Sequence, residues 1–499
     1  MGKLTDKVAK GVFWVLLEKF GIQAAHFVVT MVLARLLTPD DYGTVALLSV
    51  FIAISNILID AGFGNALIQK KKATQTDFNT VFYISITTAA FLYTGLFFAA
   101  PAIERFYDVP DLTEMMRLLA VMVVFYSING VQNAELTRKM LFKLSFRISW
   151  VRVCVSYAMG ISMAYAGFGP WALVFSQVAG GLAGTVARQL VIGWRPTMTF
   201  SWESARSLFS FGWKMTLGGV VGKLYSNLYA AVVGKCFTKA DLSFVNKGNH
   251  VAGILMNSID QTIGRVSFPA LAKMQGDPER LRGAMRRMIR SSTFLVFPLM
   301  AVLAVVADSA VVILFGEKWL PAAPYLRIAC FTYAVKPFSS VNVRAIVARG
   351  QSGTFLALVI INRIVGITAM ALSWRYGVYA FVASSAYSVG IGRIFINSYP
   401  NWRILGYSIW MQLADVLPAA LAAAGAAAAA FAAGMAFAPS SFWRIVAALP
   451  ASAVAYLAIA YVFRMAAFAD IAKAVRPTLE KKLPLSARFF TAVERRFAK

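Results

Sequence analysis

The stretch that decides the fold is 38-TPDDYGTVALLSVFIAISNILIDAGFGNALIQ-69, a short acidic turn followed by an apolar helix that carries one carboxylate, Asp60. A second copy of its skeleton lies two hundred positions later in the chain. The shared residues are Thr38, Asp41, Val45, Ile54, Ile59, Asp60 and Gly64, matched without a gap by Thr238, Asp241, Val245, Ile254, Ile259, Asp260 and Gly264. This register predicts an internal duplication; the alternative is coincidence between apolar helices of similar composition. In transporters built from duplicated bundles the substrate lies where the repeats meet.

The composition places the chain in a membrane. Of 499 residues, 59% are hydrophobic and 14% are charged, which is too apolar for a soluble protein. Segments of about 20 apolar residues predict an all-α polytopic protein with about fourteen transmembrane helices. The predicted spans are residues 11–37, 42–69, 78–100, 112–135, 144–165, 170–193, 208–234, 242–268, 291–315, 321–343, 353–374, 377–399, 410–436 and 441–463.

The placement of the positive charge sets the topology. The net charge is +27, and most of the 49 Lys and Arg residues fall in the even-numbered loops and the two tails. By the positive-inside rule both termini are expected in the cytoplasm. The richest basic runs, residues 70–72, 280–290 and 473–499, fit topology signals and contacts with anionic membrane lipids better than a nucleic-acid site.

The sequence carries no pattern of a catalytic or metal site. Cys154, Cys236 and Cys330 have no metal-ligand spacing and predict small core residues. The string GGVVGK ending at Lys223 lacks the glycine spacing and the Ser or Thr of a phosphate-binding loop. We therefore expect neither an enzyme, nor a cofactor, nor a bound metal, and no partner nucleic acid.

Polar residues form stripes on the first two predicted helices. Lys19, Gln23 and His26 follow each other at helical spacing, and Asn56 and Asp60 do the same. Lys19 and Asp60 lie at similar depth, which favours a structural ion pair, although a role for Asp60 in coupling transport to an ion gradient stays open. His26 fits a hydrogen-bonded packing residue as well as a ligand contact.

The seventh and eighth predicted helices carry matching stripes, and His250 has the same two interpretations as His26. The candidate cavity residues here are Lys214, Lys223, Asn227, Lys247, His250, Asn257, Asp260, Gln261 and Arg265. A charge facing lipid at mid-helix costs about 3 kcal/mol even on the lenient insertion scale. Cations that exceed the available acids must therefore face a polar cavity, which would favour an anionic ligand.

The local composition of the sequence predicts how the chain divides into lobes, a linker and a tail. The segment 194–207 has the composition of a cytoplasmic linker between an N-terminal lobe, 1–193, and a C-terminal lobe, 208–403. Two further helices, 404–465, contain an alanine-rich run preceded by Asp415, and a basic cytoplasmic tail, 466–499, follows.

Two short sequence patterns predict local structure. Asp277 and Pro278 predict the start of a basic helix that either lies on the membrane surface or extends the ninth span inward. Gly180, Gly181 and Gly184 predict close helix packing.

The quoted stretch, taken from Leu33 to Gln69, resembles the N-terminal signature of the Wzx-type flippases, polysaccharide exporters of the multidrug, oligosaccharidyl-lipid and polysaccharide superfamily. The resemblance implies two pseudo-symmetric six-helix lobes in a V shape, with helices one, two, seven and eight lining a cavity that opens alternately to each side. It implies an oligosaccharide repeat unit on a polyprenyl pyrophosphate as substrate, the bacterial cytoplasmic (inner) membrane as location, and polysaccharide polymerase and co-polymerase proteins as partners.

Two relatives within that superfamily are alternatives. A flippase for a lipid-linked peptidoglycan precursor would also have fourteen helices and a cationic cavity. A cation-coupled multidrug exporter would more often have an acidic cavity, so the positive balance disfavours it. A membrane-embedded polysaccharide polymerase, from a different class, would carry a large external loop, and none is predicted here.

Overall fold

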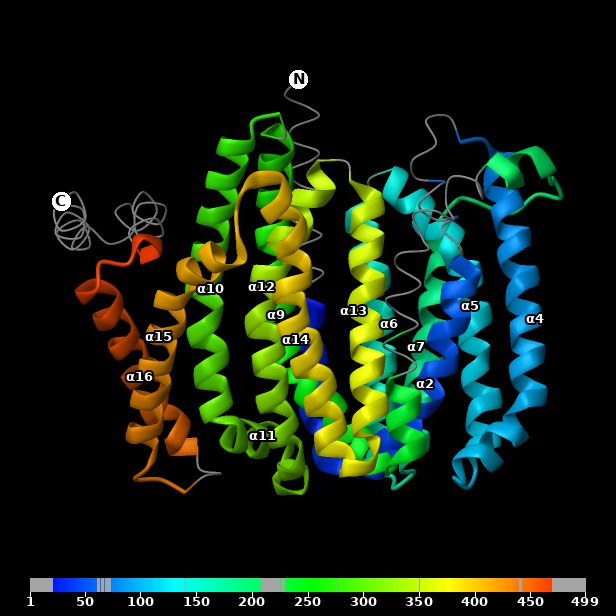
Figure 1. The fold of residues 1–499 in the computed structure, drawn as a ribbon. Coiled ribbons are helices and arrows are strands. Elements are labelled where there is room, and N and C mark those ends of the chain that lie inside the picture. Colours follow the sequence, from blue (N-terminus) through cyan, green and yellow to red (C-terminus); the bar gives the residue numbers. More distant parts are fainter. Residues whose placement is uncertain are drawn as a thin grey trace. The chain divides into compact units, whose positions relative to one another are not determined.

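Every element in the described part of the chain is helical (Figure 1). The computed structural model describes residues 21–60, 63, 67, 73–139, 141–207, 225, 229–274, 276–349, 351–438 and 442–468. Within these residues, seven helical stretches are long and apolar enough to cross a membrane, and the shorter helix Gly21–Leu36 is also apolar. The predicted class, an all-α protein with several membrane spans, is confirmed, and the count of fourteen stays a prediction.

The chain divides into two compact units, Met1–Ser243 and Phe244–Lys499, called unit 1 and unit 2 below. In unit 1, α6 packs on α7, α4 on α5, and α5 also on α2 and α7. These helices are α2 (Pro39–Asp60), α4 (Gln75–Tyr107), α5 (Leu112–Arg138), α6 (Phe142–Tyr165) and α7 (Pro170–Val191). The division falls beyond the predicted linker 194–207, so the lobe boundaries read from sequence stay predictions.

Unit 2 holds the remaining helices, and α9 (Lys239–Lys273) crosses the division between the units. Here α10 packs on α12 and α15, α12 and α13 pack on α14, and α15 packs on α16. The elements are α10 (Pro278–Val305), α11 (Ala307–Phe315), η1 (Glu317–Ala322), α12 (Ala323–Ala348), α13 (Ser352–Ser373), η2 (Trp374–Tyr376), α14 (Gly377–Leu405), α15 (Ile409–Gly434) and α16 (Phe442–Val462).

The turns of the two sequence repeats have the same local geometry. The Thr38 amide donates to Asp41 Oδ2 at 2.7 Å, and the Asp41 amide donates to Thr38 Oγ1 at 3.2 Å. The corresponding bonds between Thr238 and Asp241 measure 3.1 and 3.0 Å. Each reciprocal pair satisfies backbone N–H groups at a helix start, which is why α2 and α9 begin one residue after the Thr.

The helix start predicted at Asp277 is confirmed. The Asp277 carboxylate accepts from the Arg280 amide at 3.1 Å, and Pro278 opens α10. α10 continues to Val305, so the basic segment extends the ninth predicted span rather than forming a separate helix. The prediction of one span over 291–315 was wrong in detail, because the chain leaves helical geometry at Val306 before α11.

Three glycines of α7 allow its neighbours to approach closely, as predicted. A Cβ on Gly180 would lie 2.6 Å from Ser156 Cβ and 3.1 Å from the Arg152 carbonyl oxygen. A Cβ on Gly181 would lie 2.6 Å from Met122 Sδ of α5. The contact of α6 with α7 is also bonded, since Ser176 Oγ donates to the Ser156 carbonyl oxygen at 2.8 Å.

Within unit 2, a buried carboxylate attaches α15 to α10. The Asp415 side chain is 2% exposed and accepts from Arg286 Nε at 2.5 Å and Arg290 Nε at 2.9 Å. Tyr407 Oη donates to it at 2.8 Å. One turn earlier, the side-chain oxygen of Gln412 accepts from Asn342 Nδ2 at 2.8 Å. The alanine-rich α15 therefore docks on α10 and α12 through polar groups as well as through small side chains.

The α6–α7 contact gives a prediction. Gly180→Ala places a methyl group against Ser156 and the Arg152 backbone, so it should destabilise the protein by about 1–3 kcal/mol, the usual range for overpacking. Gly95→Ala on α4 is the control, because a Cβ there meets nothing within 4 Å. Thermal unfolding of the purified proteins in detergent measures both. Equal unfolding temperatures for Gly180→Ala, Gly95→Ala and wild type would show that α6 and α7 do not pack this closely.

Candidate functional site

Unit 1 contains a cavity of about 530 Å³ with both polar and apolar walls. The volume falls within the range of about 300–1,000 Å³ typical of ligand pockets. It is lined by side chains of α2, α5, α6 and α7. The lining residues are Asn56, Asp60, Met122, Phe125, Tyr126, Asn129, Gly130, Asn133, Ala134, Arg152, Gly181 and Arg188.

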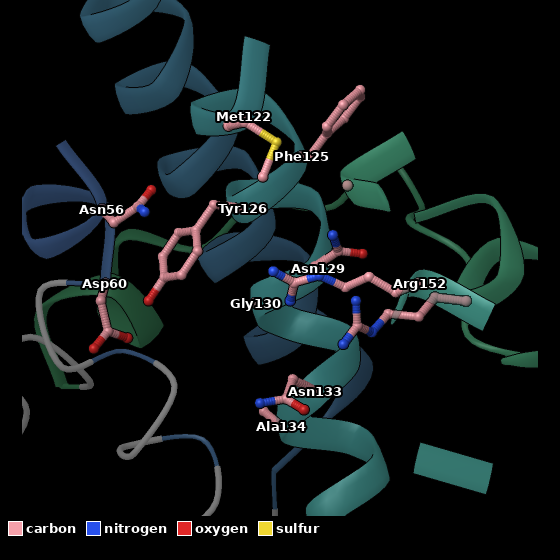
Figure 2. A pocket seen from close by; sticks show the side chains of 12 residues that line it. Asn56, Asp60, Met122, Phe125, Tyr126, Asn129, Gly130, Asn133, Ala134 and Arg152 are labelled. Atoms are coloured by element: carbon pink, nitrogen blue, oxygen red, sulfur yellow. The ribbon is translucent and has the colours of Figure 1, made fainter. Parts of the chain in front are cut away.

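The α2 side of the cavity carries the two candidates that the sequence proposed there, Asn56 and Asp60. The oxygen Asn56 Oδ1 is buried and has no hydrogen-bond partner among the described residues. Tyr126 of α5 lies between this side and the arginine side, with its hydroxyl toward Asp60 (Figure 2). The result is a wall of hydrogen-bonding groups with one carboxylate.

The opposite side carries cations. Arg152 of α6 points into the cavity beside Asn129 (Figure 2), and Arg188 of α7 also lines it. A Cβ on Gly184 would lie 3.3 to 3.5 Å from the Cβ, Cγ and Cδ atoms of Arg152. The aliphatic part of Arg152 thus lies over Gly184, which leaves room for it. The contact between α6 and α7 sets the direction of the arginine side chain.

The polar residues of α5 were missed at the sequence level. Tyr126, Asn129 and Asn133 recur at steps of three and four and all line the cavity. The spacing that marked the stripes on the first two predicted helices is present on α5 too, and could have identified them. Arg188 was missed as well; it lies beside Gln189 in the last turn of α7.

In unit 2 the repeat carboxylate Asp260 is held by cations. Asp260 Oδ1 accepts from Arg344 Nη2 at 2.8 Å and from Ser340 Oγ at 3.1 Å, and Lys336 Nζ lies 3.6 Å from Oδ2. The side chains of Asp260 and Arg344 are both 18% exposed. All three partners come from α12, so this cluster ties α9 to α12 and has two cations for one carboxylate.

The other described candidates have varied surroundings. Lys247 is buried, with its Nζ 5.0 Å from the ring centres of both Phe315 and Trp319. His26 is exposed, and its Nδ1 lies 3.0 Å from Tyr157 Oη, a hydrogen bond to α6. Gln23 is exposed and His250 is half-buried. Lys247 is stabilised by aromatic rings, an environment that the helical stripe did not predict.

Several candidates lie outside the described residues. These are Lys19, Lys214, Lys223 and Asn227, and with Lys19 the proposed ion pair to Asp60. The side chains of Asn257, Gln261 and Arg265 also lie outside the description, although their backbone belongs to α9. Their assignment to a cavity stays a prediction.

Comparisons of the sequence with known proteins point to polysaccharide biosynthesis. A family model described as "Polysaccharide biosynthesis protein" matches residues 32–324. The chain is 25% identical over 357 residues to the teichuronic acid biosynthesis protein TuaB of Bacillus subtilis (strain 168), covering 70% of this chain and 73% of that protein. It is 22% identical over 411 residues to the succinoglycan biosynthesis transport protein ExoT of Rhizobium meliloti (strain 1021), covering 82% and 81%.

One solved structure resembles the fold over almost all of the chain. The lipid II flippase MurJ, in an inward closed conformation, matches with a TM-score of 0.73 over 91% of this chain and 98% of that chain. The two sequences are 11% identical, so the similarity concerns the fold alone.

The Asp260 cluster gives a prediction about stability. Asp260→Asn leaves Arg344 and Lys336 without their carboxylate, so it should destabilise the protein by about 1–3 kcal/mol. Arg344→Gln should recover part of that loss in the double variant, because it removes one uncompensated cation. Thermal unfolding of the two single variants and the double variant measures the coupling. If the two losses simply add, Asp260 and Arg344 do not interact.

Proposed function

This chain belongs to the polysaccharide biosynthesis protein family, and from that membership we propose that it is a flippase. Its substrate is an oligosaccharide repeat unit on a polyprenyl pyrophosphate, which it moves across the bacterial cytoplasmic membrane by alternating access. The product serves exopolysaccharide or related surface-polysaccharide synthesis. Relatives named for teichuronic acid biosynthesis and for succinoglycan transport support this assignment.

The observation that carries the proposal is a polar cavity inside an apolar helical unit. Sugars present hydroxyl groups, and the cavity offers amides, a phenol and a carboxylate as their partners. Pyrophosphate is anionic, and the cavity also offers two arginines. At about 530 Å³ it accommodates part of a lipid-linked oligosaccharide, whose remainder would lie outside unit 1.

The proposal includes the finer architecture inferred from the sequence. It has fourteen helices, two six-helix lobes in a V shape, and two additional helices at residues 404–465. Both termini lie in the cytoplasm, in keeping with the placement of the basic residues. Transport rather than catalysis is the activity, and a polysaccharide polymerase with its co-polymerase receives the product.

The second candidate function is transport of a lipid-linked peptidoglycan precursor. The similarity to the fold of the lipid II flippase MurJ favours it. The names of the sequence relatives favour the polysaccharide substrate instead. A multidrug exporter is the weakest candidate, because the arginines of the cavity disfavour cationic drugs.

Reconstituted vesicles test the proposal. A polyprenyl-pyrophosphate oligosaccharide is placed in the inner leaflet, and its arrival outside is followed by its cleavage with an added glycosidase that cannot cross the membrane. We expect cleavage to be fast with the protein and slow in empty vesicles, while a lipid-linked peptidoglycan precursor stays inside. Movement of the precursor alone would establish the second candidate, and movement of neither lipid would refute both.

A further inference from the structure

Two arginines line one side of the unit 1 cavity. Arg152 and Arg188 come from neighbouring helices, and together they give two guanidinium groups against one carboxylate among the described lining residues. Asp60 lies on the other side (Figure 2). An anionic group inside the cavity would be attracted to the arginines and repelled from Asp60, so the electrostatics orient it.

The aliphatic part of the Arg152 side chain is packed against α7. Its stem lies over Gly184, and Gly180 brings the Arg152 backbone against α7. Ser156 and Ser176 bond the two helices one turn away. Arg188 follows Gly184 by one helical turn and so lies on the same face of α7. An arginine whose stem is packed in this way loses less conformational freedom when it binds a phosphate or carboxylate.

The amide of Asn129 has a determined orientation. Thr185 Oγ1 donates its one proton to the Gly181 carbonyl oxygen at 2.9 Å. It must therefore accept from Asn129 Nδ2, which lies 2.8 Å away. Asn129 Oδ1 is then left buried without a donor.

Asn56 Oδ1, across the cavity, is likewise buried without a hydrogen-bond donor among the described residues. Leaving a buried acceptor unsatisfied costs about 1–3 kcal/mol. A ligand that brings hydroxyl groups removes that cost at both amides.

We propose that Arg152 and Arg188 bind an anionic group of the transported unit, a phosphate or a carboxylate, while Asn56 and Asn129 accept hydrogen bonds from the adjacent sugar hydroxyls. The inference rests on the proposed function and adds the groups that recognise the substrate. A guanidinium pairs with a phosphate or carboxylate through two parallel hydrogen bonds, which makes the contact selective for an anion of that shape. The anion is either the pyrophosphate of the carrier or an acidic sugar of the glycan.

Binding measurements on the purified full-length protein test the proposal with three probes. The first is a polyprenyl pyrophosphate without sugar, the second is an oligosaccharide of glucuronic acid without lipid, and the third is a neutral oligosaccharide of equal length. Arg152→Gln and Arg188→Gln should each weaken binding of one anionic probe at least tenfold and leave the neutral probe unchanged. Arg147→Gln, an exposed arginine of α6 outside the cavity, is the matched control.

The outcomes separate the inference from the function on which it rests. If the variants lose binding of the first probe only, the arginines bind the carrier pyrophosphate. If they lose binding of the second probe only, the arginines bind an acidic sugar. If wild type binds an anionic probe and both variants bind it equally well, the inference is refuted and the proposed function stands. If wild type binds none of the three probes, both are refuted. Should Arg152→Gln not fold, Arg188→Gln decides alone.

Discussion

The structure depends on one constraint, that a charged side chain inside a membrane protein must be paired or must face water. Three arrangements among the described residues satisfy it, and Lys247 is stabilised instead by the rings of Phe315 and Trp319. Asp415 neutralises arginines of α10 at the start of α15, and Asp260 binds Arg344 and Lys336 of α12. Arg152 faces a polar cavity in unit 1. The first two arrangements hold helices together, and the third leaves charge available to a ligand.

The two repeat carboxylates have different surroundings, although their helices begin in the same way. Asp260 is bonded to residues of α12, which makes it part of the packing of unit 2. Asp60 lies on the wall of the unit 1 cavity beside Asn56 and Tyr126. Both helices begin with the same capping geometry, and the surroundings of the two carboxylates then differ. This difference is consistent with substrate binding in unit 1.

Features that depend on residues close in sequence could be predicted. The helix start at Asp277 follows from local capping chemistry, and the close packing at Gly180 follows from the absence of a side chain. The partners of Asp260 could not be predicted, because Arg344 is 84 residues away and a helical stripe does not specify which helix faces it. The same limit applies to Lys247: its stripe suggested a cavity but did not indicate that its ammonium lies 5.0 Å from the ring centres of Phe315 and Trp319.

The central claim is that the unit 1 cavity contains water inside the membrane, and reactivity of a cysteine at Asn133 tests it most directly. The native residues Cys154, Cys236 and Cys330 are first replaced. The account predicts that Asn133→Cys reacts with a charged, water-soluble thiol reagent, since the reactive thiolate forms only where water is present. Phe91→Cys, at an exposed apolar position of α4, should stay unlabelled in the same membranes. Labelling of Asn133→Cys no faster than that of Phe91→Cys would contradict the account.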